Sequence, residues 1–219
     1  MLLKGFKEFI NESSNGATYQ DLKLLLELGI VSDITDDVYK SFDQGLMSKD
    51  EMIDWVTPIC KKYNIIGWSI SDNGLVDVDG SVYLSLSNLN RLPLKFGKVT
   101  GNFDCGDCHL TILEGAPQEV VRNFRAYKNN LTTLAGGPKL VRGDFKCFSN
   151  QLISLEGAPQ GVGGTFDCSH NRLVTLNGAP QTVGRDFDCS YNRQLTSLDG
   201  GPSNVGGTII VENTGLNLK

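Results

Sequence analysis

Residues 166–180 read FDCSHNRLVTLNGAP, and closely similar stretches, here called frames, recur along the chain. The frames open at phenylalanines that stand 21 residues apart, namely Phe103, Phe124, Phe145, Phe166 and Phe187. The next frame opens at Ile209 after 22 residues, because Gln194 is an extra residue. A degenerate frame opens at Val82, 21 residues before the first phenylalanine. The sequence therefore predicts an array of about seven stacked turns.

The frames share five apolar positions, which in one frame are Phe166, Cys168, Leu173, Leu176 and Val183. Because side chains alternate across a strand, Phe166 and Cys168 should point to the same face, toward the core. A single frame cannot bury enough apolar surface to offset its ordering entropy, so neighbouring frames must stack. We therefore expect one parallel sheet whose strands lie about 4.8 Å apart.

Two further features recur in the full frames. The first is an asparagine, and we expect these residues to form a structural ladder whose amides bridge the backbone of adjacent turns. Its members are Asn129, Asn150, Asn171 and Asn192. The second is a Gly-Ala-Pro or Gly-Gly-Pro turn, in which glycine permits a sharp bend and proline donates no backbone hydrogen bond. The convex side should therefore carry turns or extended segments and no helix.

The strand residues that alternate with the core positions vary from frame to frame, which suggests a surface that is free to specialise. Parallel strands in register should gather these residues on the concave face. The candidate partner-binding residues are Asp104, Arg125, Tyr127, Lys146, Phe148, Asp167, Ser169, Asp188 and Ser190. The alternative is a merely solvated face, with weak surface ion pairs of Arg125 with Asp104 and of Lys146 with Asp167.

Four of these residues should form a square of two cations beside two aromatic rings. Arg125 and Tyr127 belong to one expected strand, and Lys146 and Phe148 belong to the next. Aromatic residues and Arg are favoured in interface hot spots because they bury much area with few rotors. The square is therefore the best candidate for the centre of a binding site.

The first 63 residues are predicted to form a helical N-terminal domain. Helical patterns are found over 1–10, 18–28, 36–42 and 48–63. In the clearest of these, Ser48 and Glu51 make a capping box ahead of an apolar stripe. Pro58 lies inside this helix and should kink it or end it early.

Residues 64–81 are predicted to form a hairpin or linker between the N-terminal domain and the repeats. Apolar residues alternate from Ile66 to Ile70, and Asn73-Gly74 is a type I′ turn signal. The stretch VDVDG at 76–80 has acidic residues spaced as in part of a calcium loop, but the remaining ligands are missing. A turn is therefore the better interpretation.

The six cysteines are expected to be buried, reduced thiols. Four of them occupy the second core position, namely Cys105, Cys147, Cys168 and Cys189. Cys108 completes a CxxC motif with Cys105, but it stands in the asparagine position, which argues against a zinc or redox site. A ladder of unpaired thiols fits a reducing, cytosolic compartment. We expect no metal and no cofactor.

Charge and composition disfavour several function classes. The first 81 residues carry 7 Lys and Arg against 14 Asp and Glu, and the rest carry 13 against 11, so neither part is basic enough to favour nucleic acid. The chain has no run of 18 apolar residues that could span a membrane, and residues 1–10 lack the features of a secretory signal. The only histidines, His109 and His170, fall in different frames without a free nucleophile, so no catalytic residue is expected.

The shared pattern F-x-C-x-x-N-x-L-x-x-L is similar to the leucine-rich repeat signature. The motif LxxLEGAPxxVxGxFxCSxNxL and the lead-in VDVDGSVYLSLSNLNRLPLKFGKVTGNFDC resemble the short leucine-rich repeat proteins of large tailed bacteriophages and some bacteria. The resemblance covers residues 74–219 and implies a virus-encoded, non-enzymatic binding protein. The expected fold class is α+β: a leucine-rich-repeat solenoid over 82–219, with one strand per turn, capped by helices at its N-terminal end.

A weaker resemblance lies at the start, where residues 6–12 (FKEFINE) are similar to the head-targeting leaders of internal capsid proteins in such phages. Those leaders are cleaved after an aliphatic-x-Glu motif, which Ile10-Asn11-Glu12 fits. Two hypotheses follow. The chain is a module that binds a host protein in the host cytoplasm, such as a defence factor that it inhibits. Alternatively, it is a structural or injected protein of the virion interior that is processed after Glu12.

The last expected strand begins at Ile209, and only GLNLK follows Thr214. No helix is therefore predicted to cover the outer edge of this strand. An uncovered parallel edge can pair with another chain. We expect the edge to support a homodimer or a contact with a viral or host protein.

Overall fold

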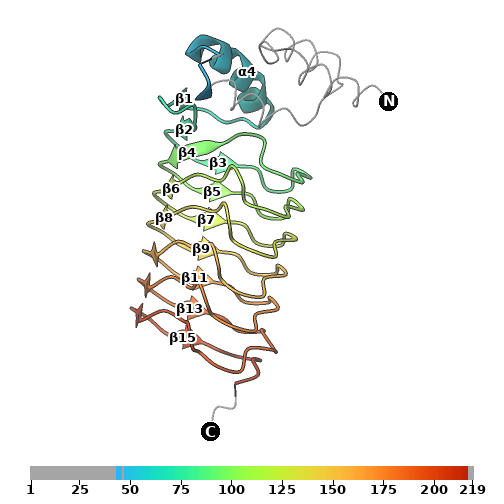
Figure 1. Ribbon diagram of the computed structural model, residues 1–219, viewed down its shortest axis with the longest axis vertical. Helices are drawn as coiled ribbons and strands as arrows, with labels where there is room; N and C mark the ends of the chain where they lie inside the picture. The colour runs from blue at the N-terminus through green and yellow to red at the C-terminus, as the bar shows by residue number, and fades with distance from the viewer. Residues whose placement is uncertain (1–42, 46, 217–219) are drawn as a thin grey trace, which may run out of the picture.

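The frames form a parallel β-solenoid of about six turns (Figure 1). The computed structural model describes residues 43–45 and 47–216. Successive turns stack along the long axis of the molecule, so that residues 21 positions apart lie on neighbouring turns. The predicted solenoid with turns of about 21 residues is therefore confirmed.

Each turn supplies two short strands, one to each of two sheets. The seven-stranded sheet is parallel and consists of β3 (Val82–Tyr83), β5 (Phe103–Asp104), β7 (Phe124–Arg125), β9 (Phe145–Lys146), β11 (Phe166–Asp167), β13 (Phe187–Asp188) and β15 (Ile209–Ile210). The eight-stranded sheet consists of β1 (Trp68–Ile70), β2 (Val76–Val78), β4 (Phe96–Val99), β6 (Glu119–Val120), β8 (Leu140–Val141), β10 (Gly161–Val162), β12 (Thr182–Val183) and β14 (Asn204–Val205). The expectation of a single sheet is wrong, because the later valine of each frame also pairs with its counterpart in the next turn, as Val162 does with Val183.

The interior holds a column of stacked phenylalanine rings. From Phe103 to Phe187 the centroids of neighbouring rings lie 5.0–5.7 Å apart, and the ring planes differ by at most 28°. Phe96 closes the column with an edge-on contact to Phe103 at 5.1 Å. All of these rings are buried, and each contributes about 1.5–3 kcal/mol by leaving water. Stacking of the turns therefore provides the core that one turn lacks.

The asparagine amides bridge adjacent turns. The side chain of Asn171 accepts a hydrogen bond from the backbone N–H of Leu152 at 3.0 Å. Its amide nitrogen donates to the carbonyls of Cys147 in the preceding turn and Cys168 in its own turn, at 3.1 and 3.0 Å. The same pattern is repeated by Asn129, Asn150 and Asn192. The ladder thus pairs buried backbone groups in the bend that follows each strand.

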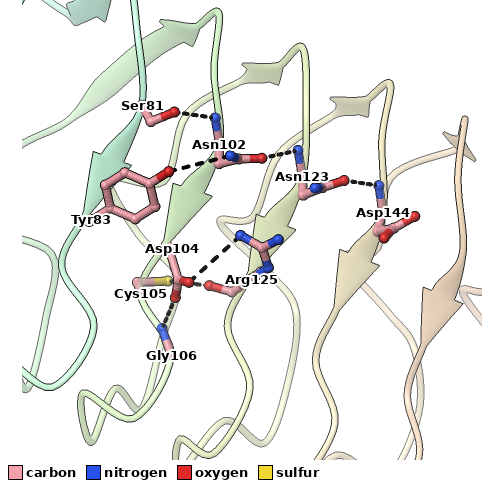
Figure 2. Close-up of polar contacts among 9 residues, drawn as sticks. All are labelled: Ser81, Tyr83, Asn102, Asp104, Cys105, Gly106, Asn123, Arg125 and Asp144. Carbon is pink, nitrogen blue, oxygen red and sulfur yellow. Dashed lines mark hydrogen bonds and ion pairs between the residues drawn. The ribbon is translucent and has the colours of Figure 1, made fainter.

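A second polar ladder, which the sequence analysis did not identify, lies just before the strands of the seven-stranded sheet (Figure 2). The Ser81 hydroxyl accepts a hydrogen bond from the N–H of Asn102 at 3.0 Å, and the Asn102 side chain accepts one from the N–H of Asn123 at 3.2 Å. Asn123 does the same for Asp144 at 2.8 Å, and Asp144 for Thr165 at 3.0 Å. The position requires only a short side chain with an oxygen acceptor, so no single residue type marks it.

All six cysteines are free and buried, which confirms their predicted burial. The Cys108 thiol, in the asparagine position, donates to the carbonyl of Leu84 in the preceding turn at 2.9 Å. Burial raises the pKa of Cys60 and of Cys189 to about 12. Burial also raises the thiol pKa of Cys105, Cys147 and Cys168 well above its ordinary value.

Helix α4 (Lys49–Lys62) begins at the predicted capping box, in which Ser48 accepts a hydrogen bond from the N–H of Glu51 and the Glu51 carboxylate accepts one from the N–H of Ser48. Pro58 was expected to kink this helix or to end it early, and the early end is wrong, because the helix continues to Lys62. Proline removes one backbone donor and crowds the carbonyl four residues before it, but the buried face of α4 packs beside β1 in the common core, which holds the last turn in place.

The predicted hairpin is confirmed, because β1 and β2 pair antiparallel. The predicted turn type is wrong, since Gly74 has a φ of 75° whereas Asn73 does not have a positive φ. The N–H of Gly74 donates to the carbonyl of Ser71 at 3.0 Å, and the N–H of Ser71 donates to the carbonyl of Leu75 at 2.9 Å. The connection is thus a three-residue loop that ends in a left-handed glycine.

The predictions for the first 42 residues lie outside the described part of the chain. They are the helical patterns at 1–10, 18–28 and 36–42 and the cleavage site after Glu12. Within the described residues, no helix combines the length and the apolar character needed to cross a membrane.

Candidate binding surface

The outward-pointing side of the seven-stranded sheet, which we call the strand face, gathers the candidate residues in rows. One row follows the core phenylalanines across the sheet and is held in register by backbone pairing. It consists of Tyr83, Asp104, Arg125, Lys146, Asp167, Asp188 and Ile210. A second row, two residues further along each turn, contains Tyr127 and Phe148.

Arg125 forms an ion pair with Asp104, with 3.8 Å between the guanidinium and the carboxylate (Figure 2). The Asp104 carboxylate also accepts a hydrogen bond from the N–H of Gly106 at 3.0 Å. The two side chains are only 28% and 11% exposed, so the pair lies against the sheet surface. The ion pair of Arg125 with Asp104, which the alternative of a solvated face predicts, is therefore present. Within the described residues, Lys146 makes no ion pair, in contrast to Arg125.

Tyr127 and Phe148 form a parallel stack, with ring centroids 4.9 Å apart and planes that differ by 4°. The Tyr127 ring leans over Gly106, where an added Cβ atom would come within 2.6 Å of the ring. Gly106 therefore provides the space that the ring occupies. Both aromatic residues are half-buried, so the stack is held in one geometry and keeps an accessible surface.

Tyr83 extends this surface, although the sequence analysis did not identify it. Its side chain is 58% exposed, and its hydroxyl accepts a hydrogen bond of 3.5 Å from the Asn102 amide (Figure 2). Hydrogen bonds with Asn102 and Ser81 lower the pKa of Tyr83. The sequence held a signal for this residue: Tyr83 follows Val82 as Asp104 follows Phe103, so the two residues occupy the same position of their frames. Leu86, in the same turn, is 77% exposed.

The part of the strand face on β11 and β13 is acidic, and its carboxylates are hydrogen-bonded to serines of their own turns. Asp167 accepts hydrogen bonds from the N–H and hydroxyl of Ser169 at 3.1 and 2.7 Å, and Asp188 makes the same bonds with Ser190. Both serines are buried, so they present little surface to a partner. Burial raises the pKa of the Asp167 carboxyl, and the neighbouring Asp188 raises it further. The candidate residues therefore divide into two halves. The aromatic half contains the stack of Tyr127 on Phe148 with Arg125 and Lys146 beside it, and the acidic half contains Asp167 and Asp188.

The two histidines lie on different turns and do not meet. His109 is exposed in the turn that begins at Phe103, whereas His170 stacks on Tyr191 with ring centroids 4.1 Å apart. Among residues 47–216, no three His, Cys, Asp or Glu side chains are arranged so that they could hold a metal ion. The thiols lie in the core and do not contribute to this surface.

Comparison of the chain with protein-family models, curated proteins and solved structures finds no match.

Proposed function

We propose that this chain is a non-enzymatic binding protein that docks a protein partner on the aromatic half of the strand face. The observation that carries the proposal is the stack of Tyr127 on Phe148, which sets two large rings on a mainly polar sheet surface. A preformed stack offers apolar area while losing little side-chain entropy on binding. Tyr83, at 58% exposure, adds a third aromatic group on the first turn.

The charges beside the stack would select the partner. Lys146 lies between Arg125 and Asp167 on adjacent strands and makes no ion pair within the described residues. It is thus available to an acidic group of the partner, while Arg125 is already engaged by Asp104. Asp167 and Asp188 would repel a partner surface that is acidic throughout. We therefore expect the partner to present an apolar patch with a carboxylate at one side.

We further propose that the solenoid is a short leucine-rich repeat encoded by a tailed bacteriophage, and that its partner is a host protein such as a defence factor. The support is the repeat motif itself, in which apolar, asparagine and glycine-proline positions recur every 21 residues. On this view, the protein acts in the host cytoplasm by covering a surface of its target.

Affinity capture from lysate of the host cell tests the proposal. The unaltered chain and the Tyr127→Ala, Phe148→Ala double variant serve as baits, and captured proteins are quantified by mass spectrometry. A protein retained by the first and lost by the second would be the expected partner. Leu140→Ala is the matched control, because Leu140 is an exposed apolar residue of the eight-stranded sheet. Equal capture by the double variant would contradict the proposal.

The second candidate function is a component of the virion interior that is processed after Glu12. It rests on the leader-like sequence at residues 6–12. Mass spectrometry of purified virions would detect a peptide that begins at Ser13 if this function is correct. The absence of the protein from virions would exclude it.

A further inference from the structure

A second aromatic stack lies outside the strand face, in the loop that follows the strands. The residue before each ladder position has a positive φ in every turn, including His170 at 53° and Tyr191 at 56°. This left-handed conformation is costly for residues other than glycine and holds the side chains at the loop edge. The His170 and Tyr191 rings are parallel within 8°, with centroids 4.1 Å apart. Tyr191 remains 42% exposed.

Two arginines stand beside this stack. Arg172 and Arg193 follow the ladder asparagines of neighbouring turns, and both side chains are exposed. Since strands of adjacent turns are about 4.8 Å apart, the side chains of Arg172 and Arg193 bring two positive charges close together. Within the described part of the chain, neither guanidinium pairs with a carboxylate. An anion that contacts both would relieve their repulsion.

The extra residue of the array reshapes this loop. In the preceding turn the N–H of Leu173 donates to the side chain of Asn192 in the next turn. In the turn that contains Gln194, the equivalent N–H of Leu195 donates instead to the backbone carbonyl of Asn192 at 3.0 Å. Thr214 stands where the next asparagine would be, and its hydroxyl donates to the carbonyl of Val211. The loop thus departs from the repeat geometry.

A hollow of about 280 Å³ opens at this departure. It is lined by His170, Asn171, Arg172, Tyr191, Arg193 and Gln194. The lining contains aromatic rings, amides and guanidinium groups but no carboxylate. Its volume lies just below the range of about 300–1,000 Å³ for small-molecule sites, so it suits a ligand no larger than a mononucleotide.

We propose that this hollow binds a nucleoside monophosphate. Arg172 and Arg193 hold the phosphate, because planar guanidinium groups donate paired hydrogen bonds to phosphate oxygens. The base packs against the rings of His170 and Tyr191, which both line the hollow. The Gln194 and Asn171 amides supply donors and acceptors for the sugar or the base edge. The site is separate from the strand face and does not depend on a protein partner.

Isothermal titration calorimetry of the full chain with AMP, inorganic phosphate and adenosine tests the site. AMP is expected to bind at least about ten-fold more tightly than phosphate or adenosine alone, because only AMP engages both the arginines and the ring. Arg172→Gln combined with Arg193→Gln should weaken AMP binding by at least about ten-fold. Arg185→Gln is the matched control, since Arg185 is exposed and lies outside the hollow.

Two further variants separate the site from folding and from the strand face. Deletion of Gln194 restores the 21-residue spacing and should abolish AMP binding while the melting temperature is retained or raised. Tyr127→Ala with Phe148→Ala should leave AMP binding unchanged. No AMP binding at millimolar concentration, equal affinity for AMP and inorganic phosphate, or unaltered AMP binding by the arginine double variant would each overturn the proposal.

The source of the ligand is decided by a final titration. A dinucleotide with a 5′-phosphate should bind no more tightly than AMP if the hollow takes a free nucleotide. Binding that is tighter by about ten-fold or more would overturn this and identify the end of a single strand as the ligand.

Discussion

The Cys108 thiol makes the same hydrogen bond across turns that the ladder amides make in later turns. Likewise, Ser81, Asn102 and Asp144 each accept a backbone hydrogen bond at the same position of the repeat. At the scale of single residues, each position thus requires one chemical property: an apolar body, a donor to a carbonyl, or an acceptor for an N–H group. This explains why residue identity varies while the geometry does not.

Asn171→Ala should destabilise the protein by about 1–3 kcal/mol, because it leaves the N–H of Leu152 buried without a partner. The carbonyls of Cys147 and Cys168 each lose one of two hydrogen bonds and keep the one from Asn150 or Asn192. Urea denaturation measures the change. Asn130→Ala is the matched control: Asn130 is exposed, and its side chain makes one long surface hydrogen bond, so its loss should cost less than about 0.5 kcal/mol. Equal losses in the two variants would contradict the bridging role of the ladder.

The thiols predict a loss of stability at alkaline pH. The pKa of Cys189 is raised from 9.0 to about 12 in the folded protein, so the unfolded chain loses its thiol proton at a lower pH than the folded chain does. This stabilisation is fully present below about pH 9 and decreases as the pH rises toward 12. Cys168→Ala should lower the stability at pH 7 by about 1–2 kcal/mol through packing and make the alkaline loss smaller.

Denaturation at several pH values, with thiol labelling of the folded protein, provides the test. Labelling should be slow until the chain unfolds. Rapid reaction of all six cysteines in the folded state would show that the thiols are neither buried nor protonated.

At the scale of elements, the two-residue strands inside the array are stable because each is paired on both sides by neighbouring turns, whereas β3, β14 and β15 have one strand neighbour each. The ends of the array are therefore the critical points. At the first end, β1, β2 and the buried face of α4 share one core with the first turns. At the other end, Ile209 is 39% exposed, whereas the equivalent Phe187 is buried.

A variant lacking residues 1–63 should be insoluble or should lose cooperative melting, because α4 packs beside β1 and its loss would expose Ile70, which is buried in the intact protein. Circular dichroism during heating measures the effect. A sharp transition at the temperature of the intact protein would show that these residues are not needed as a cap.

At the scale of the whole molecule, the 21-residue period predicted the solenoid because its core positions are strongly apolar. The eight-stranded sheet was missed because its strands from β6 onward are two residues long, and some of them are flanked by glycine, as at Val162 and Val205. Tyr83 was missed because its frame lacks both the phenylalanine and the cysteine. The hollow near Gln194 could not be predicted, since it depends on how one extra residue redirects a loop.

The open edge of β15 predicts an association between molecules. Among the described residues, no strand pairs with its outer side. Light scattering at high protein concentration should detect a dimer, and Ile210→Lys should reduce the dimer fraction by adding a charge beside the edge. A monomer at all concentrations would contradict this prediction.

The most direct test of the central claim is the affinity of the captured partner for the unaltered chain and for the Tyr127→Ala, Phe148→Ala variant, measured by calorimetry. The variant should bind more weakly by about 2 kcal/mol or more, about thirty-fold in Kd, with a nearly unchanged melting temperature. Leu140→Ala should bind as the unaltered chain does. Equal affinity of the double variant would contradict the claim that the aromatic half of the strand face is the binding site.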